Sequence, residues 1–301
     1  HPRHRGGATG VTVAAGRPRL RFRRGRTEAL ASAAEPVSMP HPVRLLQLTD
    51  LHLYGAAGGA LRGVVTWPAL EGTVAHALAH RSPWDALLIT GDLVQDDATG
   101  YARVRELFGD SDVPVDCIPG NHDEPQAMHA ALAEPPFQVG GTAQLGRWQL
   151  VMLDSYLHGS ASGRLSRDEL DRLDAALAAH PDRHALVCLH HHPVPMGSRW
   201  LDRVGLENPD ELFEVVDRHA HVRVLLWGHV HQAYEGRRQF VRLLSTPSTC
   251  AQFAPGSDGF AIDARPPAYR WLDLHDDGRV ETGVEWIEAA ARDAAPRTAR
   301  A

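Results

Sequence analysis

From residue 43 onward, the chain alternates short apolar runs with longer amphipathic segments. Short apolar runs are typical of buried strands, and apolar positions three and four residues apart are typical of helices. This pattern predicts strands at 43–50, 84–92, 113–120, 147–154, 184–190 and 221–228. Between them it predicts helices at 67–80, 99–109, 166–180 and 208–220. Ser166 and Glu169 form a capping-box pattern, and Pro209 suits the first turn of a helix.

After residue 236 the helical spacing disappears. The strand-like segments that follow are broken by glycine, proline and aspartate turns, and they lie at 238–246, 259–264, 268–275 and 278–287. The first two-thirds of the chain therefore predict an α/β domain built from strand–helix–strand units. The last third predicts antiparallel strands at the C-terminal end of the domain.

Polar residues gather where the predicted strands end. These ends read TDLH, TGD, PGNHD, CLHHH and WGHVH. In open α/β sheets, ligands bind beyond the carboxyl ends of the strands. A single aspartate there is usually a turn residue or a helix cap, but five successive ends with such side chains indicate a functional site.

The side chains at these ends offer the ligand types that suit first-row metals without any thiolate. Outside the triple histidine they are Asp50, His52, Asp92, Asn121, His122, Asp123, His229 and His231. Members two residues apart in an extended segment project to the same side. One mononuclear site needs about four ligands. Because the set supplies more, we expect two metals that share a bridging carboxylate.

The series D-x-H, G-D, G-N-H-D, H and G-H-x-H resembles the calcineurin-type dinuclear metallophosphoesterases. Within them the chain is most similar to the bacterial class III cyclic-nucleotide phosphodiesterases, of the 3′,5′-cyclic-AMP phosphodiesterase type. The similarity extends to GDLVQD (91–96), PGNHDEPQAM (119–128), LHHHPVPMGSRWLD (189–202), GHVHQ (228–232) and TPSTCAQF (246–253). It covers roughly residues 43–285.

This resemblance implies a single-domain, four-layer α/β/β/α sandwich of two mixed sheets, with two metals at the sheet ends. The ligands it implies for one metal are Asp50, His52, Asp92 and His231. Those it implies for the other are Asp92, Asn121, His190 and His229, so that Asp92 bridges. The implied reaction converts 3′,5′-cyclic AMP, or a related cyclic nucleotide, to the 5′-monophosphate by in-line attack of a hydroxide held between the metals. Fe and Mn are the expected metals, and Zn or Co would also fit.

His122 is not needed to complete either metal shell, and it follows Asn121 on a tight turn. We expect it to face the phosphate, where it stabilises charge or protonates the leaving oxygen; the alternative is a hydrogen bond within its loop. Asp123 is a candidate for orienting an imidazole or for capping a helix. The expected catalytic residues are Asp92, Asn121 and His122. The expected substrate contacts are His52, Asp92, Asn121, His122 and His231.

The segment CLHHHPVPMG (188–197) carries three consecutive histidines, which cannot all point at one metal. Alternation along an extended segment leaves either His190 or His192 as the ligand, with His191 on the opposite side. Two arguments favour His190. It stands directly at the strand end, and His192 precedes Pro193, which restricts it to an extended conformation at the start of a loop. The family motif also has its ligand at the first histidine. His191 and His192 are expected to line the pocket, to donate hydrogen bonds to ligands, or to be solvated.

The loop 196–210 follows the triple histidine and is a candidate for contacting a nucleotide. Trp200 would stack on the base, although a packing role fits equally well. Asn208 is an expected helix N-cap ahead of Pro209. Further candidates at this edge are Tyr54 with the loop 55–63, Asp154 and Ser155.

Composition and charge limit the kinds of partner that we expect the protein to bind. No apolar stretch among the 301 residues approaches the roughly 20 residues that span a bilayer. Residues 1–38 hold eight arginines and two glutamates, and the remainder carries a charge of −12, which argues against a basic groove for nucleic acid. We expect 1–38 to be a disordered basic extension or an over-long translation start. We expect 39–287 to form the metallophosphoesterase domain, and 288–301 to be a frayed tail.

The three cysteines, Cys117, Cys188 and Cys250, are odd in number and lie in or beside apolar runs. This pattern favours buried thiols in a reducing cytoplasm. The expected partner is a cyclic nucleotide, with no nucleic acid or membrane, and the expected state is a monomer or a homodimer.

Two other functions fit parts of the same pattern. The two metals could instead catalyse the hydrolysis of another phosphodiester, a phosphomonoester or a pyrophosphate. A non-catalytic scaffold of the same fold could have lost ligands or His122, and this chain retains all seven expected ligands and His122.

Overall fold

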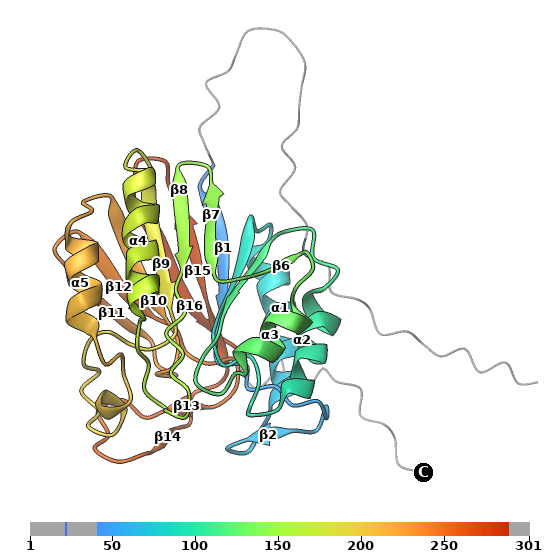
Figure 1. Ribbon diagram of the computed structural model, residues 1–301. Helices are drawn as coiled ribbons and strands as arrows, with labels where there is room; N and C mark the ends of the chain where they lie inside the picture. The colour runs from blue at the N-terminus through green and yellow to red at the C-terminus, as the bar shows by residue number, and fades with distance from the viewer. Residues whose placement is uncertain (1–21, 23–40, 289–301) are drawn as a thin grey trace, which may run out of the picture.

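The computed structural model describes Phe22 and residues 41–288, which form two face-to-face β-sheets with helices on their outer sides (Figure 1). The first sheet has the strand order β16-β15-β1-β4-β5-β6. Its strands are β1 (Val43–Leu48), β4 (Ala86–Thr90), β5 (Val115–Ile118), β6 (Phe137–Val139), β15 (Ala268–Leu274) and β16 (Val280–Trp286). The predicted α/β/β/α sandwich is confirmed.

The second sheet has the order β11-β12-β10-β9-β8-β7. Its strands are β7 (Gly141–Leu145), β8 (Trp148–Met152), β9 (His184–Leu189), β10 (Val222–Trp227), β11 (Tyr234–Arg238) and β12 (Val241–Ser245). Both sheets are mixed. In the first, β1, β4, β5 and β6 are parallel and β15 is antiparallel to β1. In the second, β8, β9, β10 and β12 are parallel, with antiparallel β7 and β11 at the edges.

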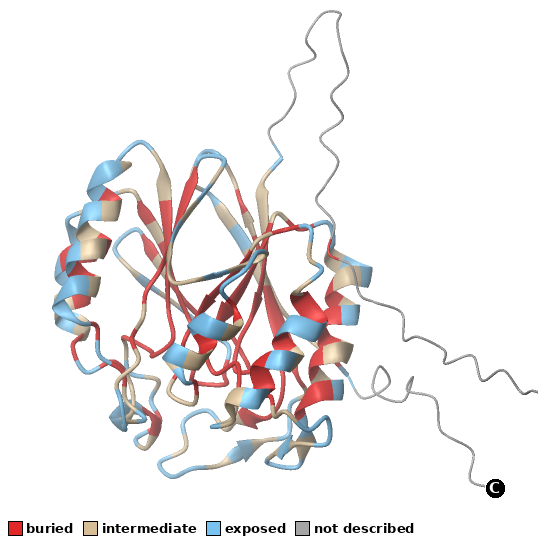
Figure 2. Cartoon of the chain, turned by 45° about the vertical axis from the view of Figure 1, so that its right-hand side comes forward, coloured by how far each residue is buried: buried red, intermediate tan, exposed pale blue. Residues whose placement is uncertain are grey.

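Three apolar layers hold the sandwich together. Along β1, Leu46 and Leu48 face the helices while Leu45 faces the second sheet, as strand alternation requires. The first sheet is covered by α1 (Thr66–Arg81), α2 (Tyr101–Phe108) and α3 (Pro125–Ala131), and the second by α4 (Arg167–Ala179) and α5 (Pro209–Asp217). Figure 2 shows these helices with buried faces toward the sheets and exposed faces outward.

Several predicted details are corrected by the structure. The segment 238–246 is not one strand, because the chain turns at Gln239, whose φ is +50°, between β11 and β12. The strands after residue 236 are not all antiparallel to their neighbours, since β12 pairs with β10 in parallel. Of 259–264, only β14 (Ile262–Asp263) is a strand, and it pairs with β13 (Gln252–Phe253). A further hairpin, β2 (Ala60–Leu61) with β3 (Val64–Val65), together with β6, β7 and α3, was not predicted.

Other expectations concern the ends of the chain, the cysteines and the helix cap. The predicted extension and tail lie outside the described residues, apart from Phe22, which is buried against Phe108, and Glu288. All three cysteines are buried free thiols, as predicted. Ser166 Oγ accepts the Glu169 amide hydrogen and caps α4. Within the described residues, no helix combines the length and apolar character that crossing a membrane requires.

Asp116 is an exception to the apolar packing between the sheets. It lies on β5 beside Cys117, is 1% exposed, and its Oδ2 has no hydrogen-bond partner. Burial raises its pKa to about 6. Because this value exceeds the ordinary one, the folded state holds the proton more tightly, and the free energy of unfolding decreases as the pH rises from about 4 to about 6.

We therefore expect Asp116→Asn to increase the free energy of unfolding at pH 7 by about 1–2 kcal/mol, since the amide avoids the cost of burying a charge. The gain should shrink at pH 4.5, where the carboxyl is protonated. Urea unfolding at both pH values measures the difference. Asp112→Asn on the surface is the control, and an Asp116→Asn variant no more stable than the parent at pH 7 would contradict the expectation.

Candidate metal centre

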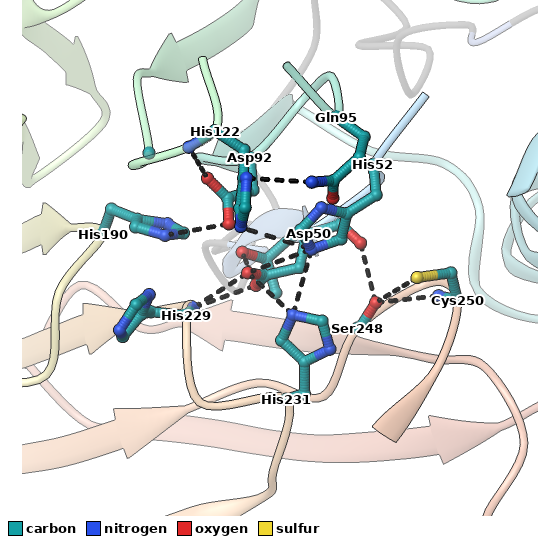
Figure 3. Close-up of polar contacts among 12 residues, drawn as sticks. Asp50, His52, Asp92, Gln95, His122, His190, His229, His231, Ser248 and Cys250 are labelled. Atoms are coloured by element: carbon teal, nitrogen blue, oxygen red, sulfur yellow. Dashed lines mark hydrogen bonds and ion pairs between the residues drawn. The ribbon is translucent and has the colours of Figure 1, made fainter. Parts of the chain in front are cut away.

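The ends of five neighbouring strands bring the predicted ligands together at one edge of the sandwich (Figure 3). Each group of residues follows its strand directly: Asp50 and His52 after β1, Asp92 after β4, Asn121 and His122 after β5, His190 after β9, and His229 and His231 after β10. The two sheets therefore contribute ligands from opposite sides. All predicted histidine and aspartate ligands are at most 7% exposed.

Five of these residues have an unusual backbone conformation. The φ angles of Asp50, His52, Asp92, His229 and His231 lie between +47° and +68°. Non-glycine residues uncommonly occupy this left-handed region, and a cluster of them in one place is typical of functional sites. The conformation turns each side chain inward immediately after its strand ends.

Backbone hydrogen bonds and glycines hold the loops close together. The amide groups of Asp50, His52 and Leu53 donate to carbonyls of residues 91–93 at 2.9–3.0 Å. A Cβ atom on Gly120 would lie 2.2 Å from Asp92 Oδ1, and one on Gly228 would lie 2.1 Å from Thr49 Oγ1. Glycine is needed at both positions because any side chain would displace the carboxylates of the site.

The first cluster consists of Asp50, His52 and His231. His231 Nε2 lies 3.2 Å from Asp50 Oδ1 and 3.1 Å from His52 Nε2. The other ring nitrogen of His231 donates to the Ala251 carbonyl at 2.6 Å, which leaves its Nε2 lone pair directed at the cluster. Asp50 is held by Thr49 Oγ1 at 2.7 Å and by the His229 amide at 3.0 Å.

The second cluster is arranged around Asp92. His190 Nε2 lies 3.4 Å from Asp92 Oδ2, and His190 Nδ1 donates to the Thr90 carbonyl at 2.8 Å. The same carboxylate oxygen is 3.8 Å from His52 Nε2, so Asp92 faces both clusters. Asn121 Oδ1 and His229 Nε2 point into buried space without any hydrogen-bond partner.

These observations fit a dinuclear metal centre. Buried polar atoms normally have partners, yet His190 Nε2, His229 Nε2 and Asn121 Oδ1 have none. Two imidazole nitrogens facing each other at 3.1 Å, as in His52 and His231, require a cation or a proton between them. The donors are nitrogen and oxygen atoms, which suit first-row metals.

The electrostatics favour the ligand forms of Asp92 and His52, whereas the pKa of His190 rises to about 9 because the charge of Asp92 outweighs the effect of burial. Burial alone would raise the pKa of Asp92, but the charges of His190, His52 and His122 outweigh it and hold the pKa well below its ordinary value. Burial lowers the pKa of His52 to about 4. The carboxylate is therefore ionised and the His52 imidazole neutral near neutral pH, as metal binding requires.

Comparison with known proteins identifies the family. The family model described as calcineurin-like phosphoesterase matches residues 43–233. The chain belongs to the calcineurin-like phosphoesterases. A dinuclear divalent metal centre is the arrangement that this family implies, and the Asp and His clusters agree with it.

Several relatives of this phosphoesterase cover most of its length. The 3′,5′-cyclic adenosine monophosphate phosphodiesterase CpdA of Pseudomonas aeruginosa is 42% identical over 82% of this chain and 90% of its own. The CpdA of Escherichia coli K12 is 39% identical over 83% and 91%. A 3′,5′-cyclic-nucleotide phosphodiesterase of Nostoc is 35% identical over 82% and 93%.

Solved structures agree with the fold. A dimetal phosphatase from Danio rerio has a TM-score of 0.58 at 14% identity, and the match covers 82% of this chain and all of the other. The Plasmodium protein GAP50 has a TM-score of 0.56 at 11% identity over 83% and 86%. At these identities the likeness concerns the fold alone.

In this phosphoesterase, His122 occupies the open side of the centre. A third of its side chain is exposed, against 3% for Asp92. Its amide donates to Asp92 Oδ1 at 2.9 Å, and its Nδ1 contacts Asp96 Oδ2 at 3.0 Å and the Gln95 amide at 2.9 Å. Sequence reasoning missed Gln95 and Asp96, although both lie in the GDLVQD motif.

Asp123 has neither of its two expected roles. Its carboxylate accepts hydrogen bonds from the amides of Leu93, Val94 and Gly120 and from the Tyr101 hydroxyl, at 2.9–3.2 Å. It therefore ties the loop after β4 to the loop after β5. Tyr101 was also missed, because a tyrosine at the start of a helix carries no motif signal.

The three consecutive histidines face three different neighbours, and none is solvated. His190 points at Asp92. His191 Nδ1 pairs with Ser155 Oγ at 2.8 Å, and one of its ring nitrogens lies within 4.8 Å of candidate ligand atoms on His190 and His229. The His192 ring packs parallel to the His229 ring with centroids 5.6 Å apart.

The loop candidates have mainly packing contacts. Trp200 lies edge-to-face against Phe253 and Phe260 with centroids 5.2 Å apart. Asn208 does not cap α5 through its side chain, which instead bonds the amide and the carbonyl of Leu165 at 3.0 Å. The loop 55–63 after Tyr54 includes the β2 strand of the β2–β3 hairpin.

Proposed function

We propose that this protein hydrolyses 3′,5′-cyclic AMP to 5′-AMP in a two-metal site. The observation that carries the proposal is 42% identity over 82% of the chain to a cyclic-AMP phosphodiesterase, in a chain whose strand ends hold two ligand clusters joined at Asp92. Both sheets are needed to assemble these clusters, and the identity spans both. The proposed substrate is therefore the one that the relatives are named for.

The proposed ligand assignment follows the two clusters. One metal is held by Asp50, His52, Asp92 and His231, and the other by Asp92, Asn121, His190 and His229. Two cations in such a site supply a nucleophile at neutral pH and neutralise the charge on the phosphate oxygens. Fe or Mn is the proposed native metal, and Zn and Co are the alternatives, because carboxylate, imidazole and amide oxygen accept all four.

The side chains of the site orient the substrate and move the proton. His190 and His231 each have one ring nitrogen fixed by a backbone carbonyl, so the other nitrogen is preorganised for its ligand. We assign to His122 the protonation of the 3′-oxygen as it leaves, because it is the exposed imidazole beside Asn121 and Asp92. Asp96 holds the His122 ring through Nδ1, which keeps Nε2 available for the substrate.

The test is a substrate panel with metal-reconstituted protein: 3′,5′-cyclic AMP, 2′,3′-cyclic AMP and p-nitrophenyl phosphate. We expect turnover of 3′,5′-cyclic AMP to 5′-AMP, measured by chromatography. If another ester is hydrolysed and 3′,5′-cyclic AMP is not, the substrate assignment is wrong while the two-metal chemistry stands. If no ester is hydrolysed with Fe, Mn or Zn, the protein is a scaffold of the same fold.

The compartment and the partners are also proposals. The three cysteines are free thiols, which supports a reducing compartment such as the bacterial cytoplasm. A cyclic nucleotide is the proposed partner, and a monomer or a homodimer is the proposed state.

A further inference from the structure

A hollow of about 410 Å³ opens beside His122. Part of its lining belongs to the loops after β4 and β5 and consists of Asp96, Asn121, His122, Asp123 and Glu124. The rest belongs to the loop after β8 and consists of Tyr156 and residues 158–161. The hollow therefore adjoins the candidate metal centre on the side where the His122 ring is exposed.

The position of His122 determines which part of the substrate this hollow can hold. In the proposed reaction the phosphate lies at the metals and His122 protonates the oxygen that leaves. That oxygen is the 3′-oxygen of the ribose, which carries the nucleoside. The nucleoside must therefore extend from the metals toward His122, into the hollow.

We propose that Tyr156 and His158 form the nucleoside subsite, with their rings contacting the purine base. The proposal rests on the proposed function, because it takes the direction of the substrate from the role of His122. Tyr156 is half-buried and His158 is exposed. Their ring centroids are 6.5 Å apart at an interplanar angle of 59°, so the two rings are not stacked on each other.

Hydrogen bonds hold together the two ends of the loop that carries these rings. The Arg164 amide donates to the Ser155 carbonyl at 3.0 Å, and the Tyr156 amide donates to Asp154 Oδ1 at 2.8 Å. His191 pairs with Ser155 Oγ at 2.8 Å and lies next to the candidate ligand His190. We assign to His191 the role of a positioning residue that fixes this loop relative to the metal centre.

A second aromatic cluster near the centre is less suited to bind a base. Trp200, Phe253 and Phe260 pack against one another with centroids 5.2–5.4 Å apart. The Arg62 guanidinium lies 4.6 Å from the Phe260 ring centroid, and Phe253 stacks on His231 at 4.0 Å. These rings do not line the hollow.

The test compares Tyr156→Ala, His158→Ala and Tyr156→Phe with the parent enzyme, and Phe260→Ala is the matched control. We expect each alanine variant to raise KM for 3′,5′-cyclic AMP about tenfold through loss of a stacking contact, with kcat within about twofold. Tyr156→Phe keeps the ring and should restore KM. His158 is exposed, so its variant should fold even if Tyr156→Ala does not.

Adenosine binding, followed by ligand-observed NMR, gives a readout that does not depend on turnover. Adenosine has no phosphate, so we expect its affinity to fall in the alanine variants while inhibition by inorganic phosphate stays unchanged. Unchanged KM and adenosine affinity in both alanine variants, or an equal loss in Phe260→Ala, would overturn the subsite. A parent protein that binds adenosine but leaves cyclic AMP intact would instead overturn the proposed function.

Discussion

Replacing His190 by alanine should reduce the metal content from two ions to one per chain and lower kcat for cyclic AMP roughly 10³-fold. A metal contributes several kcal/mol to stabilising the charge of the transition state, and about 1.4 kcal/mol corresponds to a factor of ten. His190 is fully buried, its Nδ1 is fixed by Thr90, and its Nε2 faces Asp92. Without it, one ion would lose an imidazole ligand.

His191→Ala is the matched control, because His191 is the adjacent residue and is equally buried. Since His191 Nδ1 pairs with Ser155, we expect its loss to leave about two metals per chain and to raise KM through the loop that it anchors. Inductively coupled plasma mass spectrometry gives the metal content, and steady-state kinetics separates KM from kcat. If His191→Ala lost a metal while His190→Ala retained both, the assignment of the triple histidine would be reversed.

His122→Ala should lower kcat for cyclic AMP by about 10²–10⁴-fold with both metals retained, which is the range for loss of a general acid. The 3′-oxygen of ribose is a poor leaving group and needs the proton. p-Nitrophenolate leaves without one, so hydrolysis of bis(p-nitrophenyl) phosphate should fall far less. A much larger loss of activity toward cyclic AMP than toward bis(p-nitrophenyl) phosphate would identify proton transfer as the role of His122.

The control for this experiment is His129→Ala, an exposed histidine on α3. Equal losses for the two substrates would show that His122 stabilises charge on the phosphate, which is the other role expected of it there. Loss of a metal in His122→Ala would make it a ligand, which its proximity to His52 and Asp92 permits chemically.

Much of the fold was predictable because the strands that carry the site are also the most apolar. β4, β5 and β9 are almost wholly buried, and each ends directly before a motif. The apolar run predicts the strand, and the motif that follows marks where the strand ends. By contrast, β7 alternates between exposed and half-buried residues of mixed character, and α3 has only seven residues. Neither gives a periodic signal long enough to recognise.

The arrangement around the ligands was less predictable, for a different physical reason. Left-handed residues such as Asp50 and His229 redirect the chain in ways that strand alternation does not describe. The contacts of Asp123 with Tyr101 and of His191 with Ser155 join residues 22 and 36 positions apart. Such pairs depend on how the loops pack, and no local pattern encodes them. The metal ligands themselves stay a prediction until they are tested.

The strand order of the first sheet has a consequence for synthesis of the chain. β1 lies between β4 and β15, so one of its edges stays open until residues 268–274 have been made. The contact between Asp50 and His231 likewise cannot form until His231 has been synthesised. Contacts between residues so far apart in sequence form slowly, and an unpaired strand edge invites aggregation. A ribosome-bound chain that stops short of β15 should therefore depend on chaperones, and the full set of candidate metal ligands exists only after His231 has been synthesised.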